Sequence, residues 1–346
     1  MPFTAQELEN IANAALDFHL DKGRVFSQTI QDKPLLRRMM AKSKSFPGGK
    51  EYLTQRVKGE YTTTIQGFEH DDTVGYSNPA NIKESRWPWK LIHWGIEVTI
   101  HELLKDGISL SDTAMGKGEQ RHSEREMTVL ANLLDDKIED MIEGGERGMN
   151  EMFWRDGTQD AKQIPGILSF VVDNPTAGAV VGGIDQSAAS WWRNIAVLGI
   201  NAGTPANQNL IDTMEKQWLQ QTRYGGNPNL ILCGSDYLNA YKAEMRANGS
   251  YTQTGFAGKQ SDASFGEMAF KGRPVQYDPT LDTLGRSKYC YVLDDRTIFP
   301  KHIEGENMKR HNPTRPADKY VMYRALTWVG GLVCRQRNAN AVFSIA

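Results

Sequence analysis

The chain has 346 residues, a formal net charge of −2 and 24% charged residues. It is long enough for one large domain or two medium ones, and its overall charge does not mark it as a nucleic-acid-binding or disordered protein. The acidic N-terminus excludes a secretory signal peptide, and no apolar run approaches the roughly 18 residues that span a membrane. Three widely spaced cysteines without a CxxC pair favour buried thiols in a reducing compartment. We therefore expect a soluble protein that folds in a cytoplasm.

The first 50 residues predict a helix followed by an extended basic arm. Thr4 and Glu7 form a T-x-x-E capping box, and apolar residues up to Leu16 follow at helical spacing. From Lys33 to Lys50 the sequence is polar and basic and ends in a Pro-Gly-Gly turn. A short basic cluster in a near-neutral protein favours contact with an acidic neighbour over nucleic-acid binding.

The segment from about Phe46 to Trp87 has the alternation of a β-hairpin but little apolar surface. A period of two from Gln55 to Gly67 predicts one strand, and a return strand is expected to begin at Thr73, after a charged tip. A two-stranded ribbon alone is marginally stable in water. We therefore expect this hairpin to lie on another surface, most simply on a second copy of the chain.

The rest of the chain mixes strands and helices. Residues 92–100 alternate between apolar and polar and predict a half-buried strand. Residues 120–154 carry apolar side chains at steps of three and four, which predicts a helix about 50 Å long. Gly144 and Gly145 predict a bend or a close contact within it. Further helices are expected over 209–222 and 235–246, strands over 229–233, 274–277, 289–293 and 320–334, and a mobile loop over 255–266, so the class is α+β.

No constellation of residues predicts a catalytic, cofactor or metal site. His93, Glu97 and His101 would align on a helix, but on a strand residues four apart are separated by roughly 13 Å, too far for one ion with bonds of about 2 Å. Ser235 follows Gly234 but lacks the G-x-S-x-G spacing of a nucleophile elbow, and a role as helix N-cap explains it.

The segment 182–194 reads GGIDQSAASWWRN. It resembles the G-I-D-x-x-x-x-x-W-W-R-N segment found after the spine helix in many tailed-phage major capsid proteins of the Hong Kong 97-type fold. A plainer reading is an amphipathic turn that buries two tryptophans. Segments 229–241, 270–275 and 315–334 also resemble that family, and the order of an arm, a hairpin, a long helix and a mixed α/β region is the same along essentially the whole chain.

The resemblance implies an α+β Hong Kong 97-type capsid fold with five parts. They are an N-terminal arm (1–45), an extended E-loop hairpin (46–90), a P domain (91–224, with the spine helix at about 120–154), an A domain (225–316) and closing P-domain strands (317–346).

The implied function is that of a major capsid protein, not an enzyme. It would assemble as hexamers and pentamers into the icosahedral head of a tailed double-stranded-DNA phage, in the host bacterial cytoplasm. The expected partners are a separate scaffolding protein, a portal protein, a decoration protein and, weakly and without sequence preference, the packaged DNA; no membrane is involved. The residues expected to contact a neighbouring subunit are Arg56, Lys58, Glu60, Tyr61, Glu69, His70, Asp71 and Asp72 on the E-loop, with Arg37, Arg38, Lys42 and Lys44 on the arm.

Some members of that family link an E-loop lysine to an asparagine on the closing strand, with help from a glutamate. Lys58 is suitably placed, but residues 320–334 contain neither Asn nor Glu, and no Glu follows Asn338 or Asn340. We therefore expect a shell without covalent cross-links. Two alternatives stay open: an encapsulin-like nanocompartment shell of the same fold, and an enzyme of an unrelated α+β fold.

Overall fold

The computed structural model describes residues 3–4, 31–61, 63, 65–76, 81–105, 110–111, 124–202, 209–247, 268–311 and 321–346. The chain forms two compact units, each assembled from segments distant in sequence. Unit 1 takes residues 1–31, 91–149 and 304–329, and unit 2 takes residues 32–90, 150–303 and 330–346.

Unit 1 contains most of the long helix α4 (Glu124–Trp154) and the first part of the long strand β16 (Val321–Cys334). This part of β16 pairs with β15 (Lys309–His311) and with β5 (Lys90–Thr99), which leads into α3 (Ile100–Lys105). The short strands β1 (Phe3–Thr4) and β6 (Leu110–Ser111) pair in parallel. Exposed and more buried residues alternate along β5, which confirms the predicted half-buried strand.

The predicted long helix is confirmed, and it runs through both of its central glycines. Gly145 serves a close contact, because a Cβ atom there would lie 2.5 Å from Cδ1 of Trp94. Gly145 therefore lets the Trp94 side chain of β5 approach the helix backbone, and it does not end the helix.

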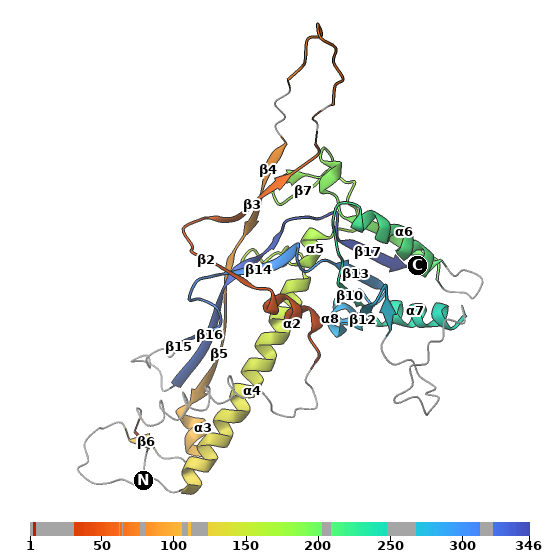
Figure 1. Ribbon diagram of the computed structural model, residues 1–346. Coiled ribbons are helices and arrows are strands. Elements are labelled where there is room, and N and C mark those ends of the chain that lie inside the picture. The colour runs from red at the N-terminus through yellow and green to blue at the C-terminus, as the bar shows by residue number, and fades with distance from the viewer. Residues whose placement is uncertain are drawn as a thin grey trace. The chain divides into compact units, whose positions relative to one another are not determined.

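Unit 2 is built around a six-stranded sheet of order β11-β12-β10-β13-β17-β9 (Figure 1). Its strands are β9 (Ile195–Ile200), β10 (Leu230–Cys233), β11 (Ala269–Phe270), β12 (Arg273–Tyr277), β13 (Tyr289–Leu293) and β17 (Ala341–Ile345). The helices α6 (Leu210–Thr222) and α7 (Ser235–Ala247), both predicted as helices, pack on it. Alternate residues of the strands meet Met214 and Tyr237 of these helices in one buried cluster.

A second sheet in unit 2 joins segments from both ends of the chain. The strand β14 (Ile298–Ile303) pairs antiparallel with the last residues of β16 and in parallel with β2 (Lys44–Phe46). Shorter elements complete the unit: α5 (Ile167–Phe170), β7 (Val180–Val181), β8 (Ile184–Asp185), a 3-10 turn (Ser190–Trp192) and α8 (Pro279–Thr283).

The expectation of an extended arm from Lys33 to Lys50 is wrong, because α2 (Pro34–Ala41) is a helix. Proline suits its first turn, and Leu35, Leu36 and Met39 give it a buried face. The Oδ1 atom of Asn150 accepts the backbone N–H of Leu36 at 2.9 Å, which satisfies a donor that the first helical turn leaves open.

Three sequence predictions remain outside the described residues or untested. Thr4 lies in β1, while the predicted N-terminal helix beyond it and the loop over 255–266 fall outside the residues that the structure describes. The boundaries of the five predicted parts stay a prediction.

Candidate functional site

The hairpin has a short ladder and a long connecting loop. The strand β3 (Tyr52–Lys58) pairs antiparallel with β4 (Ile82–Pro88), from Tyr52 opposite Pro88 to Lys58 opposite Ile82. The predicted continuation of the first strand to Gly67 and the return strand from Thr73 are wrong, since no described residue from 59 to 76 is in a strand.

The base of the hairpin is packed into unit 2. Leu53, Val57 and Trp87 lie on one face and are 3%, 8% and 3% exposed. The ring of Trp87 meets Phe170 edge-on, with centroids 4.6 Å apart. A Cβ atom on Gly182 would lie 2.6 Å from the Trp87 ring, and the Gly182 carbonyl accepts the backbone N–H of Arg86 at 2.9 Å.

The segment 182–194 that carries the family resemblance therefore packs against the base of the hairpin. Trp192 is buried, with its ring centroid 6.5 Å from that of Trp87, and its Nε1 donates to the carbonyl of Val181 at 3.0 Å. Trp191 is half-buried against Gly59, where a Cβ atom would lie 2.8 Å from its ring. Both tryptophans thus hold the hairpin.

Arg337, which the sequence analysis did not predict as a functional residue, hydrogen-bonds to this segment. It is 1% exposed, and its guanidinium donates to four oxygens. They are the Phe170 carbonyl at 2.7 Å, the Trp192 carbonyl at 3.2 Å, Gln186 Oε1 at 3.2 Å and Asn194 Oδ1 at 3.0 Å. No carboxylate binds it within the described part of the chain, and burial lowers its pKa to about 10. The GIDQ…WWRN residues therefore converge on one buried cation.

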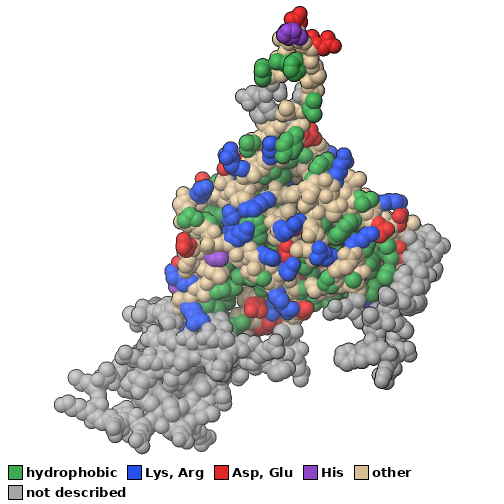
Figure 2. Space-filling model, in the orientation of Figure 1, with side chains coloured by type: hydrophobic (Ala, Val, Ile, Leu, Met, Phe, Trp, Pro, Cys, Tyr) green, Lys and Arg blue, Asp and Glu red, His purple; other side chains and the backbone are tan. Residues whose placement is uncertain are grey.

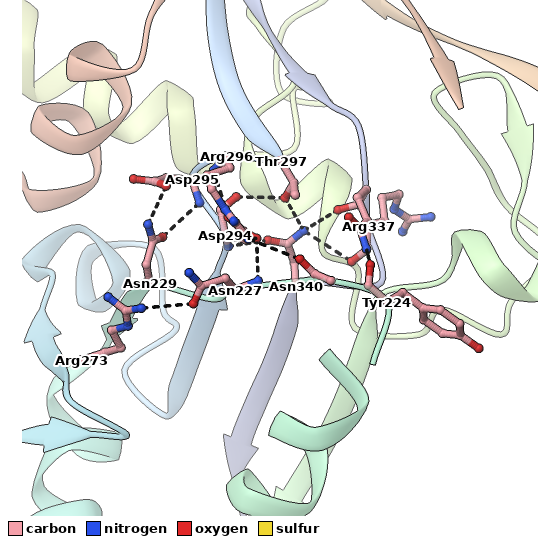
Figure 3. Close-up of polar contacts among 12 residues, drawn as sticks. Tyr224, Asn227, Asn229, Arg273, Asp294, Asp295, Arg296, Thr297, Arg337 and Asn340 are labelled. Carbon is pink, nitrogen blue, oxygen red and sulfur yellow. Dashed lines mark hydrogen bonds and ion pairs between the residues drawn. The ribbon is translucent and has the colours of Figure 1, made fainter. Parts of the chain in front are cut away.

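A second polar cluster ties the β13–β14 turn to the turn before β17 (Figure 3). Asp294 is fully buried, and its Oδ2 accepts the backbone N–H of Asn227 at 2.8 Å. The side chain of Asn340 accepts the backbone N–H of Asp294 at 2.9 Å and donates to the Gln336 carbonyl at 2.9 Å. Asn340, one of the two asparagines considered for cross-linking, is thus buried and used within its own subunit.

The loop between β3 and β4 projects away from the rest of unit 2 (Figure 1). Its apolar side chains are largely uncovered: Tyr61, Ile65, Phe68 and Tyr76 are 79%, 102%, 68% and 95% exposed. Red acidic side chains and a purple histidine stand at its far end (Figure 2). There the Asp72 N–H donates to the Glu69 carbonyl at 3.1 Å, and Asp72 Oδ2 accepts the Glu69 N–H at 2.8 Å.

The twelve predicted contact residues lie in two places in unit 2. Those of the hairpin are exposed and lie on β3 or on its loop: Arg56, Lys58, Glu60, Tyr61, Glu69, His70, Asp71 and Asp72. The other four lie on or beside α2 and β2: Arg37, Arg38, Lys42 and Lys44. Two of these cations already pair with carboxylates of their own chain, Arg37 with Asp32 at 2.8 Å and Arg38 with buried Asp295 at 2.7 Å.

No metal-binding group of three His, Cys, Asp or Glu occurs among the described residues. The three cysteines are buried and free, as predicted. Within the same part of the chain, no helix is both long and apolar enough to span a membrane.

Neither a family model nor a curated protein matches the sequence. Solved structures do match nearly the whole chain. The capsid of cyanophage A-1(L) is 16% identical over 93% of this chain and 94% of its own, with a TM-score of 0.63. The capsid of a native GTA particle is 13% identical over 94% of both chains, at 0.56. The capsid of Myoviridae phage XM1 is 11% identical over 93% and 95%, at 0.52.

This chain has the phage capsid fold. The predicted α+β, Hong Kong 97-type architecture is confirmed, and the unrelated fold that the enzyme alternative required is excluded. We call the β3–β4 hairpin with its loop the E-loop and α4 the spine helix from here on.

Proposed function

We propose that this protein is the major capsid protein of a tailed double-stranded-DNA phage, assembling as hexamers and pentamers into an icosahedral head. The observation that carries the proposal is the E-loop on a capsid fold. Its base is packed in its own subunit, while its loop exposes Tyr61, Ile65, Phe68 and Tyr76. Covering one such side chain is worth roughly 1.5–3 kcal/mol, so a second copy that covers several of them gains a large part of a stable contact.

The encapsulin-like alternative has less support. It shares the fold, but the matching structures named above are two phage capsids and a GTA particle capsid. The genes beside this one provide a direct test. A portal or terminase gene supports the phage capsid, and a cargo enzyme gene would support the nanocompartment.

We propose that the shell holds together without covalent cross-links. Asn340 is buried and hydrogen-bonded within its own subunit, and the Nζ atom of Lys58 lies over the Tyr61 ring, 4.2 Å from its centroid. Particles boiled in detergent should therefore run as a single monomer band on a denaturing gel. A ladder of linked chains would overturn this part of the proposal.

The remaining parts of the proposal concern partners and place. The shell would form in the bacterial cytoplasm with a separate scaffolding protein, receive a portal, contact packaged DNA weakly, accept a decoration protein and remain in the virion. Efficient shell formation by this chain alone would contradict the need for a scaffold. Binding to anionic nucleic acid at a net charge of −2 should be weak and should fall with added salt.

Negative-stain microscopy tests the function directly. The chain, expressed with the proteins encoded beside it, should give particles of regular diameter. Deleting Tyr61–Gly75, or combining Ile65→Ser with Phe68→Ser, should abolish particles and leave the circular dichroism of the subunit unchanged. Thr63→Ser, a conservative change on the same loop, is the matched control and should assemble normally. A chain that stays a monomer or small oligomer in every preparation would refute the proposal.

A further inference from the structure

Four cations lie on or beside the second sheet of unit 2, close enough for the other three to act on Lys301, and we call them the basic patch: Lys44 on β2, Lys301 on β14, Arg335 just after β16 and Lys50 before β3. Lys44 on β2 and Lys301 on β14 are direct neighbours in register. The Lys44 ammonium and the Arg335 guanidinium both lie over the ring of Phe299, at 4.7 Å and 4.8 Å from its centroid. The Phe299 side chain is 1% exposed, so the charges rest on a buried ring.

The cations of the basic patch are not paired with carboxylates in the part of the chain that the structure describes. Burial lowers the pKa of Lys301, and the charges of Arg335, Lys44 and Lys50 lower it further. Like charges directly opposite each other on neighbouring strands repel. An anion placed over these residues would remove that repulsion.

The end of the E-loop offers such an anion. Glu69, Asp71 and Asp72 lie within four residues of one another, on a turn already closed by two hydrogen bonds between Glu69 and Asp72. Because the turn is preformed, little conformational freedom is lost when it binds. The three carboxylates on this turn are opposite in charge to the four cations of the basic patch and would neutralise most of their charge.

The apolar surroundings also match. Half-buried Trp89 donates from Nε1 to the carbonyl of Lys50 at 2.8 Å, so an aromatic ring lies beside the basic patch. Phe68, 68% exposed, directly precedes the acidic turn. The E-loop tip therefore presents acidic and apolar surface together, opposite a patch that is both basic and aromatic.

We propose that the acidic tip of one subunit's E-loop binds the basic patch of a neighbouring subunit. This inference rests on the proposed function, because it names the surface that the E-loop would meet in a shell. Opposite charges of this kind fix orientation and partner choice. The contact should weaken as salt rises, since exposed ion pairs are screened.

Charge reversal tests the contact. Asp71→Lys alone and Lys50→Glu alone should each lower the yield of particles at least tenfold, and the two together should recover most of it. Lys162→Glu and Glu304→Lys, which reverse exposed charges elsewhere, are matched controls and should leave the yield unchanged. The melting temperature of each unassembled subunit checks that the variants fold.

Carbodiimide cross-linking gives a second, independent readout. In particles mixed from ¹⁴N- and ¹⁵N-labelled copies, mass spectrometry should find mixed-isotope links from the peptide holding Glu69 and Asp71 to Lys44 or Lys50. Absence of such links, or normal assembly of both single reversals while the Tyr61–Gly75 deletion still blocks it, would overturn this inference and leave the proposed function standing. Normal particles from Lys50→Glu that carry less nucleic acid would assign the basic patch to nucleic acid and overturn it too. Failure of the unsubstituted chain to form particles would refute the proposed function itself.

Discussion

Replacing Arg337 by methionine should lower the free energy of unfolding of the subunit by about 3 kcal/mol, judged from the costs of its buried contacts. Asn194 Oδ1 retains another donor, the backbone N–H of Val172 at 3.2 Å. The oxygens of Phe170, Trp192 and Gln186 lose the guanidinium, at roughly 2 kcal/mol for each buried acceptor left open. Against this total of about 6 kcal/mol, removing a cation whose pKa burial has lowered to about 10 returns roughly 3 kcal/mol.

Unfolding of the unassembled subunit in guanidinium chloride, followed by tryptophan fluorescence, measures this loss. Arg223→Met removes an exposed guanidinium and should stay within about 0.5 kcal/mol of the unsubstituted protein. Arg337→Lys separates charge from geometry, because lysine keeps the buried charge but cannot supply the planar fork of donors. It should destabilise at least as much as methionine. A loss below about 1 kcal/mol for methionine, or full stability with lysine, would show that the four oxygens do not depend on the guanidinium.

Three further substitutions test other parts of the same unit. Gly182→Ala should lower the melting temperature of the subunit clearly more than Gly183→Ala. Both glycines have positive φ, at 61° and 77°, but only a Cβ atom on Gly182 would meet a ring, that of Trp87, at 2.6 Å. Equal losses would contradict the contact. Trp87→Ala should cost about 3–5 kcal/mol by chemical denaturation, as expected for a large buried aromatic, and a loss under about 1 kcal/mol would show a loosely packed base. Burial raises the pKa of the Asp278 carboxyl, although Trp154 Nε1 donates to it at 2.7 Å. The contribution of Asp278 to the free energy of unfolding is therefore full below its unfolded pKa of 3.8. It is lost as the pH rises through the higher pKa of the folded protein. Asp278→Asn should remove that fall from unfolding curves measured above pH 3.8, and an unchanged pH dependence would contradict the assignment.

Local periodicity predicted most of the regular elements. The spine helix, β5, α6 and α7 repeat their apolar residues at a fixed step, so the pattern is readable within each segment. The helix α2 was missed because the basic residues around it obscured the apolar face of Leu35, Leu36 and Met39. Its first turn also depends on Asn150, which lies 114 positions away in the sequence. A partner at that distance leaves no mark on the local pattern.

The hairpin shows the same limit in another form. Alternation predicted two strands, but the length over which they pair depends on whether one face is buried. That burial comes from the packing of Trp87 against Gly182 and Phe170. The segment 182–194 was recognisable as a motif, yet its role was not. The role of Gln186 and Asn194 is to accept hydrogen bonds from Arg337, which lies 151 and 143 positions further along the chain.

The packing divides the E-loop into a base that contributes to folding and a tip that does not. Trp87 and Arg337 hold the base inside unit 2, whereas Ile65 and Phe68 are exposed and lie within the loop that connects β3 to β4. Changes at distant sites without shared partners add to within about 0.5 kcal/mol. Arg337→Met and Phe68→Ser should therefore be additive in the free energy of unfolding of the unassembled subunit, with Phe68→Ser near zero. In assembled particles the same two changes should differ in kind, because the tip variant loses the contact between copies while its fold stays intact. A coupling above about 1 kcal/mol in the unassembled subunit would mean that the tip packs on its own chain, and the exposed residues would then belong to folding instead of assembly.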